Sequence, residues 1–339
     1  MENNLNKQSY NMTGLFALSL RLVVGWTYFS AFWRRLIIAN KLNPEEAGYI
    51  GEKFNHFLPN ALGIDGIIEY LVSNPEVLWW AMAAFTIIEG IVGLFIMLGM
   101  FTRLMSFGVF SLAIGILLGS GWIGTTCLDE WQIGVLGVAS GFMLFFIGSG
   151  YYSVDKYFMD RKFKFTKTKW FPYVGSGVLP IKKMKKIVLT GALGIFFLTL
   201  YTNQHFHGGV FGTLHNKSVK PKIEISNASI QNNQLKFEIY RVEGADVYGS
   251  FLIGIQLLDE SGTIVLEKKG DDLARYPLTH IENHYVAKIK PGAHSLIIPL
   301  GAKADLTIDL QDVTGINGSS YTLKLIDISG AEWEIKIDR

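Results

Sequence analysis

The single cysteine of the 339-residue chain, Cys127, lies in the stretch GTTCLDEWQIG, between two long apolar segments. A lone thiol has no partner for an intramolecular disulfide, so it is either a small buried hydrophobe or a reactive group. Asp129, Glu130 and Trp131 follow it almost directly. Positive charge nearby would lower the pKa of the thiol and make the nucleophilic thiolate available. We therefore ask which cations reach this loop.

Two groups of cationic side chains stand at the ends of apolar segments. Arg34 and Arg35 follow the first segment, and His205, His207 and His215 follow the last one, among glycines. Guanidinium, imidazole and glycine N–H groups together favour a small oxyanion. Contact with lipid headgroups is the alternative. His-x-His also suggests a metal, but in a helix a two-residue step turns the rings to opposite sides, and no carboxylate or thiolate follows at ligand spacing. We predict an anion site and no metal.

Two ionisable residues, Arg21 and Glu89, interrupt apolar segments, where an unpaired charge is costly. Counted at 1.5 Å per residue from the predicted helix ends, both lie about 14 Å deep. We therefore predict that they form an ion pair, which serves either as a structural contact or in proton transfer. Trp122 and Trp131 flank the cysteine loop and suit an interfacial aromatic belt or a flat ring ligand.

The elements that must position these residues follow from the hydropathy pattern. The chain is 49% hydrophobic and 18% charged, and its mean hydropathy of +0.27 is too high for an ordinary soluble protein. A bilayer core of about 30 Å takes about 20 helical residues. Five segments meet that requirement, and they predict a four-helix transmembrane bundle with a fifth tethering helix. These segments are Met12–Trp33, Trp79–Thr102, Leu104–Thr126, Trp131–Val154 and Ile187–Gln204.

The distribution of lysine and arginine predicts the orientation in the membrane. The joint Asp155–Lys186 holds ten of them against two acids, which places it in the cytoplasm. The N-terminus then lies inside as well, and the Cys127 loop and everything after Gln204 lie outside. We therefore expect a bacterial cytoplasmic membrane protein with a periplasmic C-terminal domain.

From Lys220 onward, short segments alternate polar and apolar residues and are separated by turn residues such as Ser329-Gly330. About seven such strands predict an immunoglobulin-like antiparallel β-sandwich without a disulfide. The predicted domains are a bundle, a basic linker, the fifth helix, an exit segment that contributes to the site, and the sandwich. Their residues are 1–160, 161–186, 187–204, 205–219 and 220–339.

Several stretches resemble the DoxX-like membrane proteins and, more narrowly, a DoxD–DoxA fusion. LRLVVGW, EGIVGLFIMLGMFTR, GTTCLDEWQIG and GSGYYSVDKY are similar to DoxD, and TNQHFHGGVFGTLHNKSVKP with the β domain is similar to DoxA. GTTCLDEWQIG and HGGVFGTLHNKSVKP are specific, whereas the LRL and LGMFTR patterns are shared by DoxX-like proteins of other function. The resemblance implies a thiosulfate:quinone oxidoreductase, which oxidises two thiosulfates to tetrathionate and reduces a membrane quinone.

On this interpretation Cys127 is the catalytic thiolate, and Asp129, Glu130 and Glu89 move protons. The arginines and histidines bind thiosulfate, and the two tryptophans, with Glu89 and Arg21, serve the quinone. We find no GxGxxG after a strand, no CxxCH and no cysteine set, so we predict no flavin, haem or iron–sulfur cluster. A second copy of the chain or a quinol oxidase is a further candidate partner, and no nucleic acid is expected. A non-catalytic membrane scaffold and an anion carrier are the alternatives.

Overall fold

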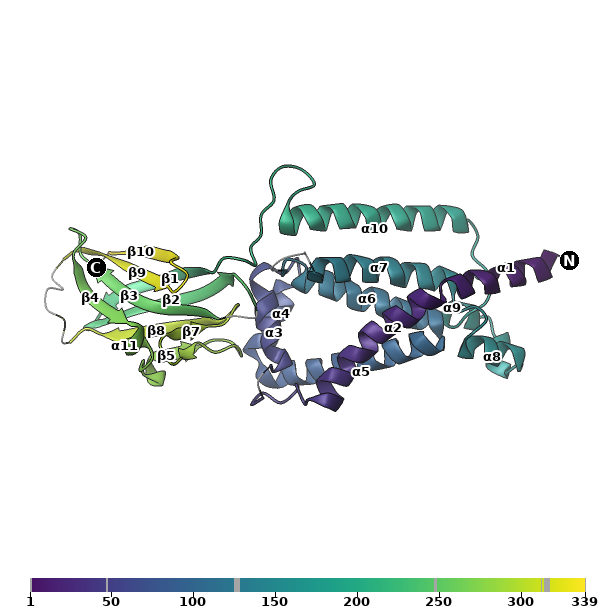
Figure 1. The fold of residues 1–339 in the computed structure, drawn as a ribbon, viewed down its shortest axis with the longest axis horizontal. Coiled ribbons are helices and arrows are strands. Elements are labelled where there is room, and N and C mark those ends of the chain that lie inside the picture. Colours follow the sequence, from purple (N-terminus) through teal and green to yellow (C-terminus); the bar gives the residue numbers. More distant parts are fainter. Residues whose placement is uncertain are drawn as a thin grey trace. The chain divides into compact units, whose positions relative to one another are not determined.

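A bent pair of helices and four long helices make up most of the first two thirds of the chain in a computed structural model (Figure 1). The structure describes residues 2–46, 48–124, 129–246, 249–311, 313 and 318–338, and only the backbone of residues 2–7 and 129. The chain divides into two units. The first comprises Met1–Ile50, Trp79–Gly121 and Asp129–His215, and the second comprises Gly51–Leu78, Trp122–Leu128 and Asn216–Arg339.

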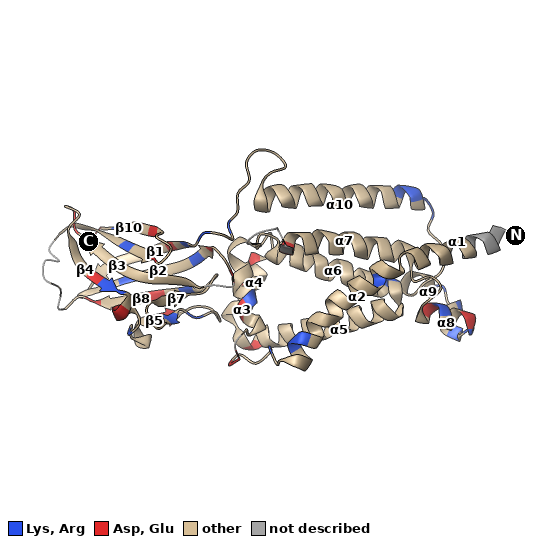
Figure 2. Ribbon diagram, in the orientation of Figure 1, with Lys and Arg blue, Asp and Glu red and all other residues tan. Residues whose placement is uncertain are grey.

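The first unit contains the apolar helices. Within the described part of the chain, four helices are long and apolar enough to cross a membrane: α5 (Pro75–Leu98), α6 (Thr102–Ser120), α7 (Asp129–Ile147) and α10 (Met184–His207). A fifth span exists if α1 (Glu2–Phe16) and α2 (Leu18–Phe32), which meet at an angle of 51°, count as one. Figure 2 shows Lys and Arg at the start of α10 and around α8 (Val154–Asp160), whereas the middles of the helices carry almost no charge. The predicted transmembrane helices are confirmed as candidate spans.

The first span ends later than its apolar pattern predicts. After α2 the helix continues as the π-helix η1 (Trp33–Ile38), so Arg34 and Arg35 lie within the helix and not in a following loop. The basic joint after α7 is also folded. It contains α8, the short helices η3 (Lys164–Lys167) and α9 (Phe171–Val174), and Phe171 is almost fully buried.

The second unit is built on two antiparallel sheets, so the predicted β-sandwich is confirmed. One sheet has the order β1-β2-β8-β5 and the other β10-β9-β3-β7-β6, with β4 paired to β3. Inward side chains of both sheets, such as Phe237, Leu257, Leu306 and Leu323, form one buried core. The strands are β1 (Lys222–Gln231), β2 (Gln234–Glu243), β3 (Ser250–Leu258), β4 (Ile264–Lys269), β5 (Ile281–Asn283), β6 (Lys290–Pro291), β7 (Leu296–Ile298), β8 (Lys303–Asp309), β9 (Ser320–Asp327) and β10 (Glu332–Asp338).

Two helices from the predicted outer loop belong to the same unit as the sandwich. In α3 (Ile50–Phe57), the Asn55 amide donates to the Gly301 carbonyl at 2.9 Å, and its oxygen accepts from the Ala287 N–H at 3.0 Å. In α4 (Asp65–Ser73), Glu69 accepts a hydrogen bond from the Tyr285 hydroxyl at 2.9 Å. These helices and the sandwich therefore form one folded body, which the sequence pattern does not indicate.

Candidate functional site

One buried site lies where α10 ends beside the end of α6 and the start of α7. We call it the exit site; it consists of Gly121, Trp131, Thr202, Phe206 and His207. The Trp131 indole N–H donates to the Thr202 hydroxyl at 3.0 Å and so joins α7 to α10. A methyl group on Gly121 would lie 2.8 Å from the Phe206 ring, so only glycine lets α10 approach α6 this closely. The exit site is therefore held by packing as well as by hydrogen bonds.

His207 is the most informative residue of the exit site. Its side chain is buried, and its Nε2 atom lies 2.8 Å from the Gly121 carbonyl. Because a carbonyl only accepts, Nε2 carries the proton, and Nδ1 is left as an acceptor. Among the described residues, this Nδ1 has no hydrogen-bond partner. A buried acceptor without a partner is unusual and marks a place where a ligand or a proton can bind.

The chain turns sharply after His207 through Gly208, whose φ of +70° disfavours any other residue. The turn brings the His215 N–H to 2.9 Å from the His207 carbonyl and fixes the end of α10. His205 and His215 are exposed, and the His205 ring stacks on Tyr201. The structure thus separates the three predicted histidines: as the two-residue step requires, His207 points inward and His205 outward.

The cysteine loop is described only at its borders. Cys127 lies outside the described residues, and so does the Asp129 side chain. Glu130 is partly buried in the first turn of α7. Before the gap, the Gly124 carbonyl accepts from the Ser218 hydroxyl and from the Asn216 amide at 3.3 Å. The stretches GTTCLDEWQIG and HGGVFGTLHNKSVKP therefore contact each other directly.

Trp122 does not offer its ring to a ligand in the way that the sequence analysis expects. Its side chain is 1% exposed, and its N–H points to the Phe57 carbonyl at 3.4 Å within the second unit. Trp131 is only partly buried, but its N–H is used by Thr202. Both tryptophans thus have structural contacts.

The predicted ion pair between Arg21 and Glu89 is wrong. Arg21 donates to the carbonyls of Ser149 and Tyr152, whereas Glu89 forms an ion pair with Arg35. The error has two causes: the helix is bent next to Ala17, so depth cannot be counted straight from Met12, and it continues through η1. Arg35 lies fourteen residues beyond Arg21, about 21 Å along a helix.

The ion pair between Glu89 and Arg35 gives Arg34 and Arg35 different possible roles. The Arg35 guanidinium is held by Glu89, whose side chain is 4% exposed, and it also lies over the Phe85 ring. Arg34 is exposed. Arg34 is therefore better suited to meet a dissolved anion than Arg35.

A buried polar network that the sequence analysis did not anticipate lies at the opposite end of the bundle from the exit site. Asp155 is fully buried and accepts hydrogen bonds from the backbone N–H groups of Phe101 and Thr102 and from the hydroxyls of Thr102 and Ser176. Arg103 is also fully buried. It donates to three carbonyls, those of Phe145, Pro172 and Gly177.

Arg21 completes this inner network through Ser149 and Tyr152. Gly99, with φ +64°, makes room for it, since a methyl group there would lie 2.9 Å from the guanidinium. LRLVVGW, LGMFTR and GSGYYSVDKY supply most of the network's side chains. A signal was present in the sequence, because Arg21 interrupts an apolar run, and Arg103 and Asp155 follow the ends of apolar runs.

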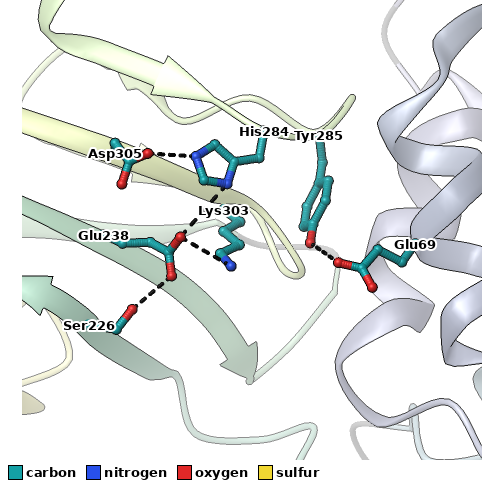
Figure 3. Close-up of polar contacts among 7 residues, drawn as sticks. All are labelled: Glu69, Ser226, Glu238, His284, Tyr285, Lys303 and Asp305. Carbon is teal, nitrogen blue, oxygen red and sulfur yellow. Dashed lines mark hydrogen bonds and ion pairs between the residues drawn. The ribbon is translucent and has the colours of Figure 1, made fainter.

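The second unit contains one group with the spacing of metal ligands, among the residues described. Figure 3 shows Glu238, His284 and Asp305 with their ligand atoms within 4.8 Å of one another. His284 Nε2 lies 2.8 Å from Asp305, and the Lys303 ammonium lies 3.1 Å from Glu238. Burial raises the pKa of Glu238, but hydrogen bonds from Ser226 and Lys303 outweigh this effect and lower it. Lys303 thus already supplies the cation at this carboxylate.

Two family models match the chain, one over its helical part and one over its C-terminal part. Residues 16–182 match the family described as TQO small subunit DoxD, and residues 206–336 match TQO small subunit DoxA, where TQO is thiosulfate:quinone oxidoreductase. No solved structure matches the chain. The first match covers α2 to the folded joint, and the second begins in the last turn of α10 and covers the sandwich. The chain therefore belongs to the DoxD and DoxA families and is a fusion of the two.

Proposed function

We propose that this chain oxidises thiosulfate and passes the electrons to a membrane quinone. The observation that carries the proposal is the pair of family matches, which together assign both small subunits of thiosulfate:quinone oxidoreductase to one polypeptide. Two thiosulfate dianions lose one electron each and join as tetrathionate. Quinone takes up the two electrons and two protons and becomes quinol.

The cysteine loop is our candidate for the sulfur chemistry. In the first half-reaction, the Cys127 thiolate and the terminal sulfur of one thiosulfate form an S–S bond while two electrons pass to quinone. In the second, another thiosulfate attacks the bound sulfur of the first. The bond to Cys127 breaks, its electron pair stays on the thiolate, and tetrathionate leaves. The contact between Gly124 and Asn216–Ser218 supports this role, because it joins the residue at which the loop begins to the DoxA part.

Thiosulfate is a small dianion and needs cations at a water-facing surface. Arg34, His205 and His215 are exposed and are our candidates for this contact. We assign His207 to proton transfer, since its unpartnered Nδ1 can accept a proton inside the exit site. Glu130, in the first turn of α7, is our candidate for exchanging protons with this site, and we give Asp129 the same role from its sequence position alone. Glu89 remains a candidate for the quinone side, and we move Arg35 there from the predicted thiosulfate site because the two residues form an ion pair.

The charge distribution supports an orientation in which thiosulfate is oxidised outside the cytoplasm. The joint between α7 and α10 and the start of α10 hold most of the lysines of the helical part (Figure 2). The positive-inside tendency would place this side in the cytoplasm of a bacterial inner membrane. The exit site and the sandwich would then face the periplasm.

Replacing Cys127 by serine tests the covalent step. We expect thiosulfate-dependent quinone reduction and tetrathionate formation by the purified, lipid-reconstituted chain to fall to background, because a hydroxyl cannot form the S–S bond. Thr126→Ser, one residue earlier, controls for disturbance of the loop and should stay active. Substantial turnover of Cys127→Ser would exclude the covalent step. If the unaltered chain oxidises no thiosulfate with any acceptor, the proposed function itself is wrong.

A further inference from the structure

A cavity lies between the π-helix η1, the loop that follows it and the first half of α5. Its volume is about 440 Å³, within the range of about 300–1,000 Å³ typical of small-molecule sites. Apolar side chains form most of its wall, and two side-chain amides stand at its rim. The residues that matter here are Leu36, Asn40, Asn43, Trp79, Ala83 and Ile87. All of them belong to the first unit.

The wall of this cavity is fixed by the π-helix and by hydrogen bonds. A π-helix carries an extra residue per turn and is most often found at functional positions. Here it ends at Ile38, and the chain folds back with the Lys41 N–H donating to the Arg35 carbonyl at 2.9 Å. The Trp79 indole N–H donates to the Leu42 carbonyl at 3.0 Å, which ties α5 to the returning loop. The cavity is therefore preformed.

The surroundings of the cavity are those of a membrane-facing site. Ile37, Ile38 and Trp80, which flank the lining residues in sequence, are 53%, 68% and 65% exposed, as expected for side chains that meet lipid. A ligand dissolved in the bilayer can therefore reach the opening sideways. Asn40 is exposed and Asn43 partly buried; the Asn43 oxygen accepts from the Glu45 N–H at 3.2 Å, which leaves the amide NH2 groups of both residues to donate to a polar headgroup.

A protonatable pair lies behind the wall. Ala83 and Ile87, four residues apart, share the cavity face of α5, whereas Phe85 and Glu89 lie on the opposite face. Glu89 pairs with Arg35, which directly precedes the lining residue Leu36. A buried carboxylate within a membrane helix is a functional candidate by default.

We propose that the headgroup of the membrane quinone binds in this cavity, with the Asn40 and Asn43 amides directed to its ring oxygens and its isoprenoid tail in the lipid. The proposal rests on the proposed function, which requires a quinone, and it names the place where the quinone is reduced. Neither tryptophan of the predicted quinone site, Trp122 or Trp131, lines this cavity.

A second apolar hollow, between α6 and α7, is a poorer candidate. Its volume is about 250 Å³, and its wall contains five phenylalanines. The one side-chain hydroxyl there, that of Ser106, already donates to the Thr102 carbonyl at 2.6 Å. It thus offers no free donor to a quinone oxygen.

Filling the cavity tests the proposal. Ala83→Phe places a ring inside it, and Ala84→Phe, one residue later on an exposed position of the same helix, is the matched control. We expect Ala83→Phe to raise the KM for a short-chain quinone by about tenfold or more, because the added ring takes the headgroup's space. Thiosulfate-dependent reduction of ferricyanide, a soluble acceptor that needs no cavity, should stay within about twofold. Ala84→Phe should leave both reactions unchanged.

A binding measurement without turnover gives an independent readout. A photoreactive azidoquinone should label peptides that contain residues 36–44 or 79–87 in the unaltered chain, and Ala83→Phe should abolish this labelling. Asn40→Leu should weaken it, because one amide donor is lost.

Labelling confined to the phenylalanine hollow, or equal quinone kinetics in Ala83→Phe and Ala84→Phe, would overturn this inference while leaving the proposed function intact. Failure of the unaltered chain with both ferricyanide and quinone would instead refute the proposed function.

Discussion

The two ends of the helical bundle differ in how their buried polar side chains are hydrogen-bonded. In the inner network, the Asp155 carboxylate accepts four hydrogen bonds and the Arg103 guanidinium donates to three carbonyls. At the exit site, His207 is equally buried, but one of its two ring nitrogens has no partner among the described residues. One donor of the inner network, Arg21 Nε, also lacks a partner among the described residues, but a guanidinium has no acceptor and takes up no further proton. A carboxylate and a guanidinium with all their partners stabilise one structure, whereas an unmatched basic acceptor lowers stability unless a ligand or proton uses it. We infer that the first end is structural and the second catalytic.

The largest expected effect is at the structural end. Asp155→Ala leaves four donors without their acceptor and should lower the free energy of unfolding by about 3 kcal/mol or more. The measurement is chemical unfolding of the detergent-solubilised chain. Asp160→Ala, which removes an exposed carboxylate paired with Lys156 on the same helix, should cost about 0.5 kcal/mol or less. Equal losses in the two variants would contradict a structural inner network.

At the exit site we expect a large loss of activity with little loss of stability. His207→Gln keeps a donor for the Gly121 carbonyl but removes the basic nitrogen, so kcat for thiosulfate oxidation should fall by about a hundredfold with little change in stability. His205→Gln, on the exposed side of the same helix turn, should instead raise the KM for thiosulfate. A stability loss in His207→Gln that matches that of Asp155→Ala, with normal kcat, would make both ends structural.

A third histidine, His56, sharpens the comparison. It is buried, and its Nδ1 atom has no hydrogen-bond partner among the described residues and lies 4.0 Å from the Asp246 carboxylate, but it belongs to the second unit and has no part in the proposed reaction. Burial, with the positive charge of Lys53, lowers the pKa of His56 in α3 to about 4. As the pH falls below 6.5, the unfolded chain binds a proton that the folded chain does not. Stability should therefore decrease by about 1.4 kcal/mol per pH unit between pH 6.5 and 4.

Thermal unfolding of the full chain across this pH range measures the effect, and His56→Gln should remove that part of the slope. An unchanged slope in the variant would assign it to other groups. Because the proposed reaction uses no group of His56, catalytic activity at pH 7 should not change in His56→Gln.

Much of the architecture could be predicted from the sequence. Long apolar runs and alternating segments are properties of the chain itself, so the membrane helices and the β-sandwich follow from them. The exposed His205 and the buried His207 also follow, once α10 is known to reach His207. The partner of a buried charge is different, because it depends on the straightness of a helix. Because of the bend beside Ala17 and the π-helix, Arg21 lies in the inner network, and Arg35 is the residue that pairs with Glu89.

The inner network and the grouping of α3 with the sandwich could not be predicted for a related reason. Arg103 binds backbone carbonyls of residues 145, 172 and 177, and such groups carry no sequence signature. Asn55 likewise contacts the backbone of Ala287 and Gly301. Side chains that satisfy distant backbone atoms become visible only in the folded chain.

The Trp131–Thr202 hydrogen bond and the close fit of Gly191 of α10 against Phe142 of α7 form the seam along which the fifth helix meets the bundle. In this chain the folded joint between α7 and α10 precedes that seam, so the contact between the two helices forms within one molecule, at an effective concentration that the joint sets. If the chain were cleaved within the joint, the same few contacts would have to work between two separate molecules diffusing in the bilayer. Because the two parts are fused, a small interface between α10 and α7 is enough to keep them together. Two separate subunits would need a larger interface to stay associated.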